Sequence, residues 1–188
     1  MAKIPLQLRP SCCSAQVSSR ANVRRCRRFE VALDRATMAR SSLEFLALFL
    51  AGLLAGEEFV VRFGVRDAIA TLDDVAHLQV RQALIVRLRV LVPALFVPAL
   101  LAGIVATVAD GTAPGLGWRC AGVAALVAWL AVTAAGTVPI NSAVFDWDPV
   151  APPAGWRVLV DRWERLNTLR CWLALGAFAA LLTGVALR

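Results

Sequence analysis

The chain has 188 residues, 59% of them hydrophobic, and a formal net charge of +7 at pH 7. Soluble domains usually contain about 45–50% apolar residues, so this composition argues against an ordinary soluble enzyme. The sequence holds one His and five Cys without a C-x-x-C pair, which argues against a zinc, thiol-redox or c-type haem site. We therefore expect neither a metal site nor an evident cofactor.

The first forty residues differ from the rest of the chain. They contain Lys3 and eight Arg against two acids, Glu30 and Asp34, and no sustained apolar period. This composition predicts a disordered basic extension over residues 1–40. Three interpretations stay open: an organellar transit peptide, a tail that contacts anionic lipid or nucleic acid, and translated sequence upstream of a physiological start at Met38.

The distribution of Arg and Lys favours the start at Met38. Counted over the full chain, the side of the N-terminus holds 11 Lys and Arg and the opposite side holds 9. Counted from Met38, the ratio becomes 3 to 9, and the positive-inside rule then assigns loops 62–89 and 139–170 to the cytoplasm of a cell-membrane protein. The basic segment is thus weak evidence for nucleic acid, and we expect no nucleic-acid partner.

Four apolar runs follow the extension, and crossing a bilayer takes about 20 helical residues. Two of the runs lack any charged residue and any polar stripe, which a surface helix of a soluble bundle would carry. The sequence therefore predicts an all-α integral membrane four-helix bundle over residues 41–188, surrounded by lipid. A soluble bundle of buried helices is the alternative. The predicted spans are 43–61, 90–109, 120–138 and 171–187.

Nearly all polar chemistry falls on one side of this predicted bundle. Loops 62–89 and 139–170 carry it, whereas the opposite side has only the turn "DGTAPGLGWR". Both loops are expected to contain amphipathic helical extensions. Thr71 with Asp74 fits a capping box for the first, and the second is expected to begin at Gly155 and continue into the fourth span.

Two carboxylates near the end of the first run, Glu57 and Glu58, are candidate functional groups. An ionised carboxylate at this depth is costly unless it is paired or hydrated. Neighbouring helical residues point about 100° apart, so one Glu is expected to face the bundle and the other to reach water. A structural salt bridge is the alternative role. The candidate partners are Arg81, Arg87, Arg89 and Arg170.

Two further positions carry weaker signals. Asn141 follows Pro139, which is expected to interrupt the helix, and its side chain could cap the freed backbone groups or hold a ligand oxygen. Gly52 and Gly56 form a G-x-x-x-G pattern, which is compatible with a homodimer.

The pattern "VPIN…W…P…W…DRWERLNTLR" resembles the anthrone oxygenase-like family of small four-span membrane proteins. The family pattern is an Asn after the third span, then W-x-x-x-H/N-x-x-R at the start of the fourth. Asn141, Trp163, Asn167 and Arg170 match it. Gly56-Glu57-Glu58 fits the family's small residues with an acid at the end of the first span. The resemblance covers about residues 42–187, and many members have His at the position of Asn167.

This resemblance implies a membrane oxidoreductase that oxidises a hydrophobic phenolic or polyketide-like small molecule with molecular oxygen. The deprotonated substrate can supply the electrons, so no metal or flavin is strictly required. Such a site needs a base, groups that hold an enolate oxygen, and an apolar slot for flat rings. The implied roles are Glu58 as base, Arg170 and Asn141 as oxygen-holding groups and Trp163 as ring platform, with Asn167, Glu57 and Arg81 completing the substrate-binding set.

A non-enzymatic membrane protein is the competing hypothesis. In that case the polar face would dock a partner or lipid, and the Glu–Arg pairs would be structural. A transporter has less support, because the two halves show no clear repeat and no span centre carries a charge. Convergence of Glu58, Asn141, Trp163 and Arg170 on one pocket would favour the enzyme.

Overall fold

The computed structural model describes residues 20–111 and 113–187, and these residues form helices and turns without a strand. The predicted all-α fold is therefore confirmed. Two of the helical segments, η2 and η3, are π-helical turns. The elements are α1 (Arg20–Val60), η2 (Val61–Val65), α2 (Arg66–Ala70), α3 (Asp74–Asp110), α4 (Leu116–Val132), η3 (Thr133–Thr137), α5 (Val138–Phe145) and α6 (Trp156–Ala186).

Three helical stretches in the described part of the chain are long and apolar enough to cross a membrane. They are Asp74–Ala109, Leu116–Phe145 and Trp156–Ala186. They contain the second, third and fourth predicted spans, and they support an all-α membrane protein. The first predicted span, 43–61, lies in α1 and is not among them, so the count of four spans stays a prediction.

The structure differs from the sequence prediction at residues 20–40. We expected disorder there, but these residues form the first part of α1. Ala, Arg, Leu and Glu favour helix, and extending an existing helix avoids the cost of nucleating a new one. Residues 1–19 lie outside the described part of the chain. The chain divides into two compact units, 1–39 and 40–188, and the second unit holds the features described below.

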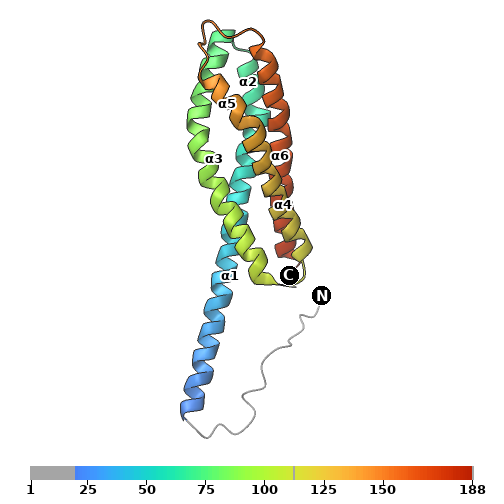
Figure 1. The fold of residues 1–188 in the computed structure, drawn as a ribbon. Helices are drawn as coiled ribbons and strands as arrows, with labels where there is room; N and C mark the ends of the chain where they lie inside the picture. Colours follow the sequence, from blue (N-terminus) through green and yellow to red (C-terminus); the bar gives the residue numbers. More distant parts are fainter. Residues whose placement is uncertain (1–19, 112, 188) are drawn as a thin grey trace. The chain divides into compact units, whose positions relative to one another are not determined.

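Within residues 40–188, the polar segments gather at one end, as the sequence predicted. Figure 1 shows α2, the start of α3, the end of α5 and the start of α6 at that end, with the α3–α4 turn at the other. Gln82 of α3 fixes this arrangement, because its side-chain amide donates to the carbonyl oxygens of Val144 at 3.0 Å and Trp147 at 2.8 Å. The end of α5 is thereby held against α3.

The polar end corrects one local expectation, the capping box at Thr71. The N-cap of α3 is Asp73, whose carboxylate accepts from the Ala76 N–H at 2.9 Å, whereas Thr71 donates backwards to the carbonyl of Ala68. Helix α3 continues through Pro93. Trp156 at the start of α6 is buried in a small cluster with Leu78 and Val160.

The main hydrophobic core is built from α1, α3, α4 and α6. Its members are mostly small or aliphatic, so the helices approach closely. The two aromatic members, Phe96 and Trp129, stack with ring centroids 4.7 Å apart. The fully buried residues at its centre include Leu54, Leu126 and Ala177.

The G-x-x-x-G pattern of α1 does not present one free surface. An added Cβ at Gly52 would lie 3.3 Å from the Phe178 ring of α6, so this glycine serves packing within the chain. Gly56 is exposed and faces open space. A homodimer through these glycines stays a prediction.

Helices α4 and α6 pack closely at Gly122. A Cβ at this position would meet Leu181 Cγ at 2.7 Å and the Ala177 carbonyl oxygen at 3.1 Å. Neither atom can move aside by a simple side-chain rotation, because Leu181 Cγ is the branch point of its side chain and the Ala177 oxygen belongs to the backbone. The glycine therefore sets the distance between the two helices.

We expect Gly122→Ala to lower the free energy of unfolding by about 1–3 kcal/mol, because the extra methyl overpacks this contact. Denaturant or thermal unfolding of the purified protein in detergent measures the change. Gly176→Ala in α6 is the matched control, since nothing lies within 4 Å of a Cβ there. Equal destabilisation by both substitutions would contradict the conclusion that Gly122 sets the distance between α4 and α6.

Candidate functional site

A cavity of about 730 Å³ lies between α3, α6 and the continuous run α4–η3–α5, with one residue of α1 in its wall. This volume is in the range of small-molecule sites, about 300–1,000 Å³. Its walls are mainly aliphatic and aromatic. The polar side chains that line it are Glu57, Arg89, Thr133, Thr137, Asn141, Ser142, Asp146, Asn167 and Arg170, together with the indole of Trp163.

An ion pair between Glu58 of α1 and Arg170 of α6 lies beside this cavity. Glu58 is 1% exposed and Arg170 is 7% exposed, so both charges are buried. Trp129 donates from Nε1 to Glu58 Oε1 at 3.1 Å. The Arg170 guanidinium carbon lies 4.6 Å from the centre of the Trp129 ring, in a cation–π contact. Arg170 also donates to Thr137 Oγ1 at 3.5 Å. Side chains from α1, α4 and η3 thus orient the Arg170 guanidinium of α6 at the cavity wall.

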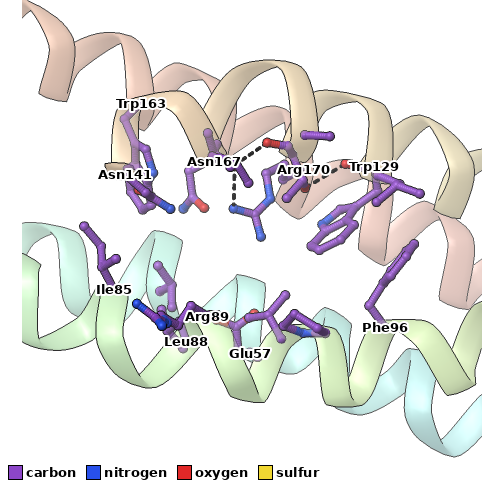
Figure 2. A pocket seen from close by; sticks show the side chains of 18 of the residues that line it. Glu57, Ile85, Leu88, Arg89, Phe96, Trp129, Asn141, Trp163, Asn167 and Arg170 are labelled. Carbon is purple, nitrogen blue, oxygen red and sulfur yellow. Dashed lines mark hydrogen bonds between the residues drawn. The ribbon is translucent and has the colours of Figure 1, made fainter. Parts of the chain in front are cut away.

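Three N–H donors form a row along one face of α6. Trp163, Asn167 and Arg170 follow one another at helical spacing, and all three line the cavity (Figure 2). In the described part of the chain, Trp163 Nε1, Asn167 Nδ2 and Arg170 Nε are buried and have no hydrogen-bond partner. Buried donors are nearly always satisfied, so this row is suited to oxygen atoms of a ligand or of water.

A carboxylate lies across the cavity from this row. Glu57 lines the cavity opposite Asn167 and Arg170, and its Oε2 is buried without a hydrogen-bond partner among the described residues (Figure 2). Asn141 of α5 is half-buried and lines the same cavity near Trp163. It caps no helix end, because the N-cap of α5 is Thr137 and forms no side-chain cap bond.

Arg81 supports the site from outside the cavity. Its guanidinium donates to Glu164 Oε1 at 2.8 Å and lies 4.7 Å from the centre of the Trp163 ring. Arg66 holds the other oxygen of Glu164 at 3.4 Å. Arg81 therefore positions Trp163 and is not among the cavity-lining residues.

The two π-helical turns adjoin the site. η2 begins at Val61, three residues after Glu58, and Val61 lines the cavity, while η3 contributes Thr133 and Thr137 to the cavity wall. Pro139 explains η3 in part, since its ring cannot donate to the carbonyl four residues earlier and would clash with it in a regular α-helix. π-Helical turns inside longer helices are frequent at functional sites.

The three glutamates of the first predicted span, 43–61, occupy three different environments. Glu44 pairs with Arg40 at 3.6 Å and with Arg119 at 3.7 Å. Glu58 pairs with Arg170, and Glu57 faces the cavity. Two of the three carboxylates of the first predicted span are therefore neutralised by a cation, as a group in an apolar medium requires.

The predicted site residues converge in part. Glu57, Asn141, Trp163, Asn167 and Arg170 line one cavity. Glu58 and Arg81 do not line it, although each holds a residue that does.

Sequence reasoning missed Trp129, Thr137 and Glu164. Trp129 gave a usable signal, because a Trp in the middle of an apolar run lies far from the membrane interface and its N–H needs a partner. Thr137 and Glu164 gave none. Among residues 20–111 and 113–187, no three His, Cys, Asp or Glu side chains are grouped in a way that could hold a metal ion.

The fold and the cavity define an all-α membrane protein with an apolar cavity of small-molecule size. The anthrone oxygenase family profile matches residues 82–180, more than half of the chain, and the chain belongs to this family. The match includes Asn141, Trp163, Asn167 and Arg170, whereas Glu57 and Glu58 precede it. No curated protein and no solved structure matches the chain significantly.

We expect Arg170→Met to destabilise the protein by about 3–5 kcal/mol, because it leaves the buried Glu58 carboxylate without its cation. The double variant Glu58→Leu/Arg170→Met removes both charges and is expected to recover much of this loss. Unfolding in detergent compares the two. Arg162→Met, an exposed position on the same helix, is the control. A double variant no more stable than Arg170→Met would contradict a dominant role for this pair.

Proposed function

We propose that the protein is a membrane oxygenase that oxidises a hydrophobic phenolic or polyketide-like substrate of the anthrone type. One observation carries the proposal: an apolar cavity brings the Glu57 carboxylate opposite the donor row of α6. Membership of the anthrone oxygenase family supports an oxidoreductase function of this kind.

The proposed chemistry begins with removal of a proton. An anthrone has a methylene opposite its carbonyl, and loss of a proton gives an electron-rich aromatic enolate. The Glu57 carboxylate accepts this proton, and the Arg170 guanidinium and Asn167 amide hold the enolate oxygen. Each donor is fixed by its helix before the substrate arrives, so charge develops against groups that need little reorganisation.

Oxygen then reacts with the enolate carbon. The carbon gives its electrons to dioxygen and forms a C–O bond, and the peroxide oxygen takes a proton to give a hydroperoxide. Loss of water from the hydroperoxide leaves a carbonyl, so the methylene and one O₂ become C=O and H₂O. The substrate supplies all four electrons, and the proposal includes no metal or flavin.

Glu57 replaces Glu58 as the proposed base. The sequence favoured Glu58, but this side chain is 1% exposed, does not line the cavity, and binds both Arg170 and Trp129. Glu57 has a free oxygen at the cavity wall. Glu58 is then a positioning residue that acts through the Arg170 guanidinium.

We further propose a cell-membrane location with four spans, α1 supplying the first. The polar end of residues 40–188 is the proposed cytoplasmic side, in agreement with the excess of Arg in segments 62–89 and 139–170. The substrate would reach the cavity from the bilayer.

Glu57→Gln is expected to reduce the rate of anthrone oxidation by about 10²–10⁴-fold, because the amide cannot accept the proton. Asn167→Leu is expected to reduce it less, since Arg170 still holds the enolate oxygen. Oxygen uptake and quinone absorbance measure the rate with purified protein in detergent. Spontaneous oxidation is subtracted from every measurement.

Asp67→Asn removes an exposed carboxylate outside the cavity and serves as the matched control. All variants are compared at equal folded yield. A wild-type rate equal to the protein-free blank would overturn the proposal, and so would a Glu57→Gln rate equal to that of the control.

A further inference from the structure

The cavity is longer than the donor row of α6. Along α3 its wall extends from Ile85 to Leu101, which corresponds to about 24 Å at about 1.5 Å of rise per residue. Along α6 it includes only the stretch from Trp163 to Arg170, about 10 Å by the same rise. The donor row therefore faces less than half of the cavity length, and the whole exceeds the length of three fused rings.

The two ends of the cavity differ in chemistry. One end holds Asn141 and Trp163, and the middle holds Asn167, Arg170 and Glu57 (Figure 2). Beyond the stacked pair of Phe96 and Trp129 the wall has no polar side chain. The residues that continue the wall along α3 there are Val97, Leu100 and Leu101.

The rim of this apolar extension is exposed. Val97 and Leu101 line the cavity and are nevertheless 48–57% exposed. They belong to the second predicted span, 90–109, which carries no charge, so in a membrane this rim faces acyl chains. The polar end lies nearer the end of the bundle where the charged segments gather.

We propose that the site takes an amphiphilic hydroxyarene, whose aromatic head binds the donor row and whose aliphatic tail lies in the apolar extension. This inference rests on the proposed function for the head and adds the tail to it. The tail is the part of the ligand that the length of the cavity requires. A compact tricycle alone would leave the extension from Phe96 to Leu101 without an occupant from the substrate.

The membrane gives this arrangement a physical reason. A tailed phenol in a bilayer already has its hydroxyl near the headgroups and its chain toward the centre, which is the polarity order of the cavity. Transfer from lipid to an apolar wall has little hydrophobic driving force of its own. The tail therefore confers selectivity through shape and orientation: the extension must be open for a tailed substrate to place its head at Glu57.

Leu100→Trp tests the inference by filling the extension, and Val105→Trp on the same helix is the control, since Val105 is exposed and does not line the cavity. The probes are dihydroxyanthraquinone, its decyl derivative and decanol. Binding to protein in lipid nanodiscs is followed by the fluorescence of the two quinones. Decanol is added as a competitor.

Leu100→Trp is expected to weaken binding of the decyl quinone by about tenfold or more, because the new ring occupies the volume of the tail. The undecorated quinone should bind both variants and the wild type alike, and decanol should compete poorly. An equal effect on both quinones, or no effect on either, would overturn the inference. Efficient competition by decanol would also overturn it, because the extension would then be a site for any lipid chain.

Oxygen uptake with the two corresponding anthrones separates this inference from the proposed function. Selective binding of the decyl quinone without any protein-dependent oxidation would support the tail site and overturn the proposed oxygenase function. Oxidation of both anthrones at equal rates, unaffected by Leu100→Trp, would support the proposed oxygenase function and overturn the tail site.

Discussion

The buried ion pair of Glu58 and Arg170 is the interaction on which the rest of the site depends. It joins α1 to α6, and Trp129 binds both partners, so α4 is tied to the same point. Removing two charges from water is expensive, and an apolar pair of similar volume often gives equal or greater stability. The pair is therefore better explained by what it orients. It holds a guanidinium at the junction between the donor row and the apolar extension of the cavity.

Much of the fold was predictable because hydropathy and length report directly on helices in an apolar medium. The donor row was predictable too, since Trp163, Asn167 and Arg170 recur at helical spacing and α6 is one continuous helix. The choice between Glu57 and Glu58 was not. Both candidates follow from the sequence, but which one faces the cavity depends on the rotation of α1 against α6. That rotation is set by contacts such as Gly52 with Phe178.

The contacts of Trp129 and Thr137 could not be predicted from the sequence for one shared reason. Trp129 and Thr137 act through partners 71 and 33 residues away in the chain, at Glu58 and Arg170. Local patterns carry no information on such pairs. The helix over residues 20–40 was missed for the opposite reason, because composition without an apolar period suggested disorder while helix propensity and continuity with α1 favoured order.

The Asn at position 167 reduces the number of side chains in this site that can accept a proton. Many family members have His at this position, and an imidazole could both donate to an oxygen and accept a proton. The amide of Asn can only donate or accept hydrogen bonds, and here its Nδ2 is buried, unpaired in the described part of the chain, and adjacent to Arg170 on the cavity face. The Arg170 guanidinium carries hydrogen-bond donors and no acceptor. In the proposed reaction, Glu57 is then the polar group in the middle of the cavity that accepts a proton from a bound substrate, with Asn167 and Arg170 left to hold the oxygen on which the negative charge resides.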